Sequence, residues 1–112
     1  MGSLSVLSSQ LNIESVSYKM GELIPANTPI QMATVTDRTG YMHPKWFRYE
    51  NMEQQVIRVD IERVMSQETV KYAGIFEKRF ICSVVLDNVR YVIEFRYNIE
   101  TQKWRIFQVI SS

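Results

Sequence analysis

The segment 55–64 limits the fold of this chain more than any other part of the sequence. Positions 57, 59 and 61 carry Ile, Val and Ile, whereas the positions between them carry Arg58, Asp60 and Glu62. A period of two gives a strand one apolar face and one charged face, which is typical of an antiparallel sheet buried on one side. The chain must therefore contain a sheet and must cover one face of it.

The last third of the chain predicts three more strands in a meander. Residues 80–86 are almost wholly apolar and partly β-branched, which indicates a central strand. Asp87 and Asn88 follow, and both residue types tolerate the positive φ that a tight hairpin needs. The alternation returns over 91–97, a polar reversal covers 98–103, and residues 104–110 form the last strand.

The region upstream is predicted to hold two shorter strands and one irregular excursion. Residues 30–36 form a strand, 37–40 a turn, 45–50 a short aromatic strand and 51–53 a second turn. Pro44 has no amide donor and fits an edge, a loop or a first strand position. Residues 66–79 are polar and contain Gly74, so we expect a longer excursion between strands, with room for a helical turn around 72–76.

These strands predict an all-β fold, because no long amphipathic helix is available to cover the sheet. Five to six short strands joined by tight turns must curl upon themselves, which also removes exposed edges. We expect a small, partly open antiparallel barrel or roll of SH3-like or OB-like size. With 112 residues the chain holds one core. Residues 1–28 are expected to be a partly ordered N-terminal arm, with one strand docked on the domain formed by 29–112.

Several of these strand and turn patterns resemble a group of small uncharacterised bacterial β domains. The likeness covers about residues 30–108 and is carried by the turn 37–40, the aromatic strand after Pro44, the alternation at 56–59 and the spacing of Tyr91, Glu94 and Tyr97 before Lys103-Trp104. The resemblance implies a bacterial source and the same fold. It implies no activity, because that group has none to carry over.

Charge and cysteine usage argue against several function classes. The formal net charge is +1, from 13 basic and 12 acidic residues, whereas a dedicated nucleic-acid binder usually has a clear basic excess. One cysteine cannot form an intramolecular disulfide framework. The apolar runs are too short to cross a bilayer, and the N-terminus has no secretory pattern. We therefore expect a cytoplasmic protein without a membrane partner.

The residues that could carry chemistry have simpler structural explanations. Cys82 lies in an apolar strand and is expected to be a buried thiol rather than a nucleophile paired with His43, the only histidine. Asp60, Glu62 and Glu94 could supply an acid and a base, but cross-strand pairing with arginines on a solvated face explains them more simply. We expect no catalytic residues, no metal site and no cofactor.

A basic and aromatic surface is the best binding signal in the sequence. The cations that could form it are Lys45, Arg48, Arg96, Lys103 and Arg105. Small barrels hold single-stranded nucleic acid by stacking bases on rings inside a positive groove. The strand period, however, places many rings in the core, and it leaves open whether Trp46 and Trp104 point inward or outward.

Three functions from different classes remain open from the sequence. The first is a non-enzymatic interaction module that binds a protein or peptide through a sheet edge, near Pro44 or the N-terminal arm, or that forms a homodimer. The second is a nucleic-acid binder that uses the five cations. The third is a small enzyme or ligand-binding pocket with a carboxylate as acid or base, which solvated carboxylates make the weakest of the three.

Overall fold

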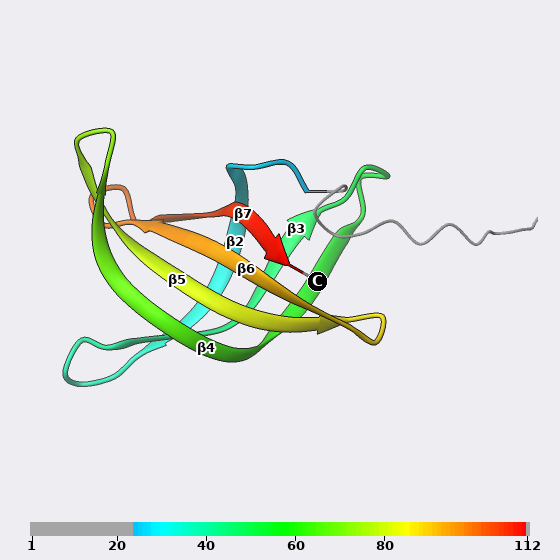
Figure 1. Cartoon of the computed structure of the whole chain (residues 1–112), viewed down its shortest axis with the longest axis horizontal. Helices are drawn as coiled ribbons and strands as arrows, with labels where there is room; N and C mark the ends of the chain where they lie inside the picture. Colours follow the sequence, from blue (N-terminus) through cyan, green and yellow to red (C-terminus); the bar gives the residue numbers. More distant parts are fainter. Residues whose placement is uncertain (1–23, 112) are drawn as a thin grey trace, which may run out of the picture.

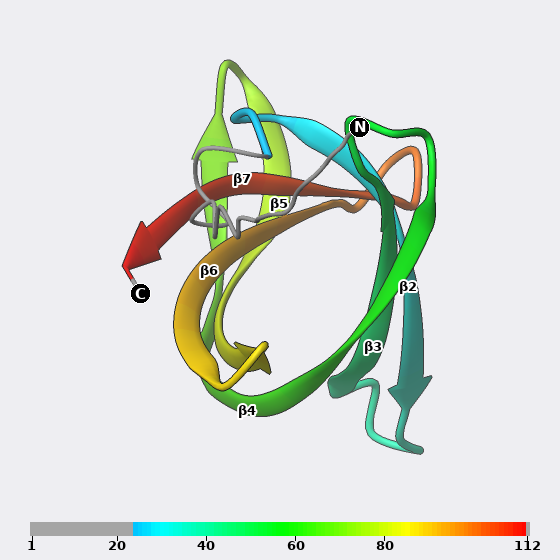
Figure 2. The ribbon, with the colours of Figure 1, turned by 90° about the vertical axis from the view of Figure 1, so that its right-hand side faces the viewer.

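A computed structural model describes residues 24–111, which form an all-β closed barrel. Its strands are β2 (Thr28–Thr36), β3 (Met42–Glu50), β4 (Val56–Tyr72), β5 (Ile75–Leu86), β6 (Val89–Asn98) and β7 (Lys103–Ser111). Each strand pairs antiparallel with the next, and Figures 1 and 2 show them winding around a common axis. The predicted fold class is confirmed. Most of the predicted N-terminal arm lies outside the described residues.

The barrel closes through a short ladder between its first and last described strands. Thr28 pairs with Ile106, Pro29 with Arg105 and Ile30 with Trp104. All the other neighbouring strands share longer ladders, so this seam is the shortest in the barrel wall. The sequence suggested a partly open barrel, and the structure closes it with these few pairs.

Large apolar side chains fill the inside of the barrel. Phe47, Phe80 and Phe95 are fully buried, and the Phe47 and Phe95 rings meet edge to face with centroids 5.1 Å apart. Trp104 also points inward and packs against Phe80 at 5.0 Å. Burying each such ring stabilises the fold by roughly 1.5–3 kcal/mol. The interior is thus a packed core, built from the apolar positions that the period of two predicted.

The prediction of an irregular excursion over 66–79 was wrong. Strand β4 continues to Tyr72, β5 begins at Ile75, and only Ala73 and Gly74 separate them. Both have positive φ, 51° and 82°, as a two-residue hairpin turn of type I′ requires. This part of the hairpin extends past β6 and β7, as Figure 1 shows, so both of its faces meet water and its polar composition concealed the strand period.

Two other predicted turns, at 87–88 and 37–40, are confirmed by backbone angles or hydrogen bonds. Asp87 and Asn88 join β5 to β6 with φ of 52° and 63°. In the turn between β2 and β3, the Asp37 carboxylate accepts hydrogen bonds from the backbone amides of Thr39 and Tyr41, at 2.9 and 3.0 Å. A short polar side chain that binds the backbone two residues on is a common way to stabilise such a turn.

Strand β4 bends away from β3 halfway along its length. Its register against β5 shifts twice, between Ile61 and Arg63 and between Val64 and Ser66, and bulges of this kind bend a strand. The ladder from β3 to β4 ends where Trp46 pairs with Asp60. Beyond that point, the Gln67 side chain donates a hydrogen bond to the Met42 carbonyl across the gap, at 3.0 Å.

Pro44 lies in the part of β3 that forms no ladder with β4. It also lies at the register shift between β2 and β3, where it pairs with Thr34. Both places tolerate a residue that has no amide donor. The expectation from the sequence, that Pro44 marks an edge or an irregular strand position, is consistent with this placement.

Candidate interaction surface

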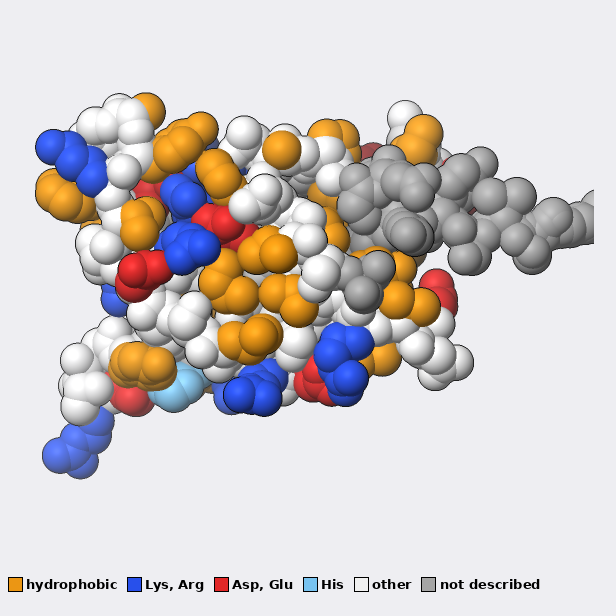
Figure 3. All heavy atoms as spheres, in the orientation of Figure 1, with side chains coloured by type: hydrophobic (Ala, Val, Ile, Leu, Met, Phe, Trp, Pro, Cys, Tyr) orange, Lys and Arg blue, Asp and Glu red, His pale blue; other side chains and the backbone are white. Residues whose placement is uncertain are grey.

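Three arginines form a row across the outer face of β5, β6 and β7. Arg79 lies directly opposite Arg96, and Arg96 directly opposite Arg105. Like charges directly opposite one another destabilise a sheet unless other groups compensate them. Here glutamates from β4, β5 and β6 lie among the arginines, and Figure 3 shows the two kinds of charge intermixed on this face. We call this set the arginine row.

Each glutamate of the arginine row binds at least one guanidinium group. Glu94 accepts from Arg79 Nε at 2.9 Å and from Arg96 Nε at 2.8 Å. Glu77 accepts from Arg96 at 3.1 Å and from Arg105 at 2.5 Å, and Glu68 accepts from Arg79 at 2.6 Å. The network therefore contains three arginines and three glutamates, and its charges balance.

The two central carboxylates of the arginine row are buried yet remain ionised. Glu94 is 2% exposed and Glu77 is 3% exposed. Burial raises the pKa of Glu94, but hydrogen bonds from Gln108, Arg96 and Arg79 outweigh it, so the pKa lies below its ordinary value. Hydrogen bonds from Arg105 and then Arg96 likewise lower the pKa of Glu77. These groups hold charge in place, and neither can donate a proton near neutral pH.

The remaining candidate carboxylates are also ion-paired, and they lie apart from Glu94. Asp60 accepts a hydrogen bond from Arg58 at 3.2 Å. Glu62 accepts from Arg90 at 2.7 Å and from Ser83 at 2.9 Å, and these bonds lower the pKa of Glu62 to about 2. Cross-strand pairing is thus confirmed for Glu62 and Glu94, whereas Asp60 pairs with Arg58 of its own strand, β4. The solvated setting predicted for Glu94 was wrong, because the arginine row encloses it. Neither Glu62 nor Glu94 has the raised pKa that a general acid needs, since the pKa of each is lowered.

Two aromatic rings cover one end of the arginine row. The Arg96 guanidinium lies 4.0 Å from the centroid of the Phe107 ring and 5.3 Å from that of Tyr72. The two rings meet edge to face at 5.3 Å. Cations over ring faces are stabilised by about 0.5–2 kcal/mol, more where water is excluded. Tyr72 is the last residue of β4, so this contact holds the projecting hairpin against β7.

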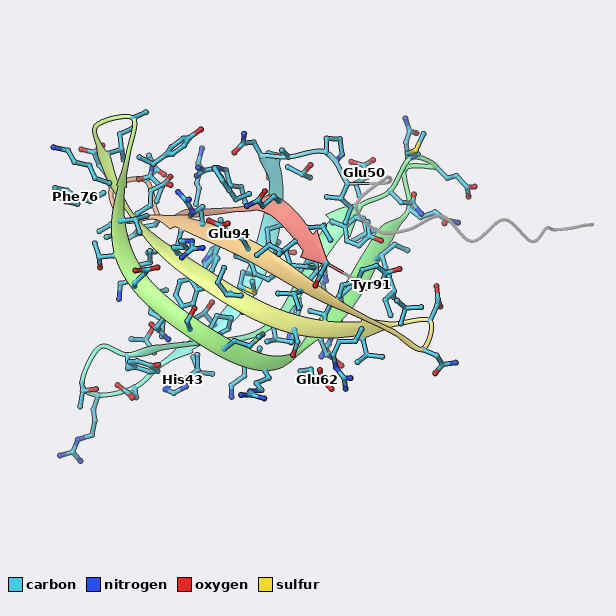
Figure 4. All side chains as sticks on the ribbon, viewed as in Figure 1. His43, Glu50, Glu62, Phe76, Tyr91 and Glu94 are labelled. Atoms are coloured by element: carbon cyan, nitrogen blue, oxygen red, sulfur yellow. The ribbon has the colours of Figure 1, made fainter. Side chains whose placement is uncertain are left out.

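Beyond these rings, the hairpin carries an apolar surface that faces water. Its members are Tyr72, Ile75, Phe76 and Ile99, and we call them the hairpin end. Phe76 is 58% exposed, and Figure 4 shows it on the outer side of the hairpin, just below the turn. Ile75, Phe76 and Ile99 also line a shallow hollow together with Gly74 and Glu100. Contiguous exposed apolar side chains of this kind mark interaction sites more often than isolated ones do.

Next to the hairpin end runs an unpaired strand edge. Among residues 24–111, no strand pairs with β4 on the side away from β5 between Ile61 and Tyr72. The backbone donors and acceptors on this side form no ladder within the described part of the chain. An unpaired edge can add a strand from another chain. We call this segment the free edge of β4.

The structure separates the cations that the sequence proposed as one basic surface. Arg96 and Arg105 belong to the arginine row and are neutralised there by Glu77. Lys103 begins β7 and lines a different hollow, beside Gln102 and Trp104. Lys45 and Arg48 lie on β3, where both are exposed. The five cations therefore form no continuous groove.

The two tryptophans point in opposite directions. Trp104 belongs to the core, whereas Trp46 lies half-buried on the outer face of the barrel. The guanidinium groups of Arg58 and Arg48 lie 4.4 and 4.9 Å from the centroid of the Trp46 ring. The sequence left the direction of both rings open, and the structure places Trp104 inside the barrel and Trp46 outside it.

The single thiol and the single histidine do not meet as a catalytic pair. Cys82 is fully buried, and burial raises the pKa of its thiol to about 12, so it is no nucleophile at neutral pH. His43 lies near the surface, as Figure 4 shows, with Nε2 3.4 Å from Asp37. Within residues 24–111, no three His, Cys, Asp or Glu side chains are grouped so that they could hold a metal ion.

Comparisons with known proteins add no relative. The chain matches no protein-family model, no curated protein and no solved structure. In the described part of the chain, no helix has the length and apolarity needed to cross a membrane.

Sequence reasoning missed the hairpin end and the aromatic cover of the arginine row. Tyr72 and Phe76 fell in the segment interpreted as an irregular excursion. A signal was available there, because Val70 and Tyr72 alternate with Thr69 and Lys71 before the Ala73-Gly74 turn. The burial of Glu94 had no such signal, since it depends on side chains from three other strands.

Proposed function

We propose that this protein is a non-enzymatic interaction module that binds an extended segment of another protein chain along the free edge of β4. The observation that carries the proposal is the backbone of β4 from Ile61 to Tyr72, which pairs with no other strand of residues 24–111 on the side away from β5. Added strands gain affinity from main-chain hydrogen bonds and specificity from side-chain contacts. A second copy of this chain, which would form a homodimer, is one donor of such a strand.

The hairpin end gives the added strand its apolar anchors. Tyr72 and Ile75 are paired residues at the tip of the hairpin, and Phe76 follows directly. A strand that runs along β4 toward its C-terminal end therefore meets Tyr72 first, and it reaches Ile75 and Phe76 of β5 only where it continues around the Ala73-Gly74 turn. Exposed rings contribute strongly when a partner buries them, because large amphipathic side chains dominate most protein interfaces.

The arginine row supports this surface from beneath. Its ion pairs join β4, β5, β6 and β7, and Tyr72 packs on its end. The edge is thus attached to a rigid wall, which lowers the entropic cost of binding. The ionised carboxylates also favour binding over acid–base chemistry, for which one of them would have to take up a proton near neutral pH.

We place the module in the bacterial cytoplasm as part of the same proposal. The buried, unpaired Cys82 suits a reducing compartment. The bacterial assignment rests on the resemblance of residues 30–108 to small bacterial β domains.

The first test asks whether a second copy is the partner. We expect multi-angle light scattering over a concentration series to show a dimer, and a proline at position 69 or 70 to abolish it. Neighbouring amides of a strand point to opposite sides, so one of these prolines removes a bond to β5 and the other removes an outward donor. The variant that keeps wild-type stability is the edge variant. A monomer at all concentrations excludes the homodimer.

The second test detects any other protein partner. Phe76 is replaced by the photoreactive residue p-benzoylphenylalanine, which keeps an exposed ring, and cross-linking is compared with and without the edge proline. The matched control carries the same photoreactive residue at Met52, which is exposed in the turn between β3 and β4. The proposal requires a product that forms from position 76, is absent from position 52 and is lost in the edge variant. A product that survives the edge proline contradicts strand addition.

A further inference from the structure

A second pair of opposed arginines lies on the outer face of β3 and β4. Arg48 is directly opposite Arg58, and Trp46 is directly opposite Asp60. The two guanidinium groups lie within 5 Å of the centroid of the same Trp46 ring, at 4.9 and 4.4 Å. Both arginines are exposed, in contrast to the buried Arg96 of the arginine row.

In the arginine row, glutamates neutralise the opposed arginines. Among the described residues, the second pair of arginines has fewer carboxylates to neutralise it. Three glutamates balance three arginines in the row. Among residues 24–111 the second pair has one carboxylate, Asp60, which binds Arg58. Within the same part of the chain, Arg48 has only a long contact of 3.4 Å to the side-chain oxygen of Gln31. Glu50, two residues further along β3, forms no ion pair with either arginine.

The surroundings of this arginine pair are suited to an anionic ligand. Lys45 is exposed on the same strand and adds to the positive potential. Arg48 also lines a shallow hollow of about 280 Å3, together with Gln31, Tyr49 and Val56 among others. The Trp46 ring lies beside both guanidinium groups, which restricts their motion and leaves their N–H groups available to a ligand.

We propose that Arg48 and Arg58 bind a phosphate group, with Trp46 as the ring that orients them. Guanidinium groups bind phosphate oxygens through paired, charge-assisted hydrogen bonds, and a phosphate would supply the negative charge that the pair lacks. The phosphate belongs either to a nucleic-acid backbone or to a free phosphorylated compound such as a nucleotide. This site is separate from the free edge of β4, and the proposal does not depend on the protein partner.

Trp46 provides a direct reporter of the site in the unmodified chain. The sequence has two tryptophans, so an NMR spectrum of 15N-labelled protein contains two indole N–H signals, and Trp46→Phe assigns them. In a titration with sodium phosphate against sodium chloride of equal ionic strength, we expect a saturable shift of the Trp46 signal alone. The buried Trp104 signal stays in place. A Trp46 signal that phosphate moves no more than chloride does overturns the proposal.

Charge-removing variants test whether the arginine pair itself is the site. Arg48→Gln and Arg58→Gln are each expected to weaken phosphate binding at least fivefold. Lys103→Gln is the matched control, because it removes one exposed charge from a different strand and should leave the affinity unchanged. Equal weakening by all three variants indicates attraction to net charge only and contradicts a defined site.

Two ligands distinguish the sources of the phosphate. A single-stranded oligonucleotide that binds at least tenfold more tightly than a mononucleotide, with an affinity that falls steeply with salt, identifies a nucleic-acid backbone. Equal affinities identify a free phosphorylated compound. Failure of both ligands, like failure of phosphate itself, overturns the site and leaves the strand-addition proposal intact.

Discussion

Arg96 lies directly opposite Arg105 in the ladder between β6 and β7, and the Glu77 carboxylate binds both guanidinium groups. Without that carboxylate, two like charges would face each other on neighbouring strands, one of them largely withdrawn from water. Glu77 is itself 3% exposed, so the three side chains depend on one another. The strand that closes the barrel, β7, is therefore joined to β6 and β5 by charge as well as by its backbone.

Replacing Glu77 should destabilise the protein strongly. Glu77→Gln keeps the shape of the side chain but leaves Arg96 and Arg105 opposed, and breaking a buried ion pair on one side costs about 3 kcal/mol. Urea denaturation followed by circular dichroism measures this loss. Glu100→Gln, in the exposed turn before β7, is the control and should change the free energy of unfolding by less than about 0.5 kcal/mol. A Glu77 variant as stable as this control would show that the arginine row is not needed for folding.

The free energy of unfolding should fall in acid, over a range that the carboxylates define. The pKa values of Glu62, Glu77 and Glu94 are lowered in the folded protein from an ordinary value of 4.5, that of Glu62 to about 2. Below about pH 4.5 the unfolded chain binds protons that the folded protein does not. The free energy of unfolding therefore falls with each step down in pH. Above that pH range, the full stabilising contribution of these carboxylates is present.

Denaturation experiments at pH 7, 5, 4 and 3 test this dependence. The denaturation midpoint should change little between pH 7 and 5 and then fall steadily. Glu62→Gln should make the denaturation midpoint fall less in acid. This variant lacks a carboxylate that takes up a proton more readily in the unfolded chain than in the folded protein. Glu53→Gln is the control, since Glu53 forms no ion pair with other residues of the described chain. A wild-type midpoint that stays constant to pH 3 contradicts the ion pairing described here.

The fold was predictable from the sequence because strand periodicity and turn residues act locally. The alternation around Val59 and the Asp87-Asn88 turn each specify their own geometry, and together they require a curled antiparallel sheet. Strand β4 was predicted too short, because beyond Gln67 it extends past the core. There, neither face of the strand has to be apolar, so hydrophobic periodicity no longer indicates a strand.

The candidate surfaces were less predictable, since they depend on register between strands. Arg96 and Arg105 were recognised as cations, but nothing local places Glu77 between them. Arg48 was selected correctly as an exposed cation, whereas its partner Arg58 was assigned only to a charged strand face. The carboxylates that neutralise Arg79 and Arg105 lie on other strands, far away in the chain, and a single sequence does not specify such contacts.

The hairpin that the sequence did not predict offers a test of its turn. Ala73 has a φ of 51°, a conformation that costs an alanine roughly 1 kcal/mol and that asparagine adopts more easily. We expect Ala73→Asn to raise the melting temperature and Gly74→Ala, at a φ of 82°, to lower it. A Cβ at position 74 meets no atom within 4 Å, so any loss there comes from the backbone alone. If both variants melt like the wild type, the two-residue turn is incorrect.

The thiol of Cys82 should be protected until the barrel unfolds. Its side chain is fully buried between strands, and burial raises the pKa of the thiol to about 12, so almost no thiolate forms at neutral pH. Disulfide exchange requires the thiolate and access to solvent. Ellman's reagent should therefore react with the native protein at least a hundredfold more slowly than with protein in denaturant. Because Cys82 is the only cysteine in the chain, the reaction reports on this strand alone.

A Val85→Cys variant in the Cys82→Ala background places the thiol at an exposed position of the same strand and should react at once. Equal rates for the two positions would mean that β5 does not present its alternate residues to opposite faces, and the barrel core would have to be reassigned.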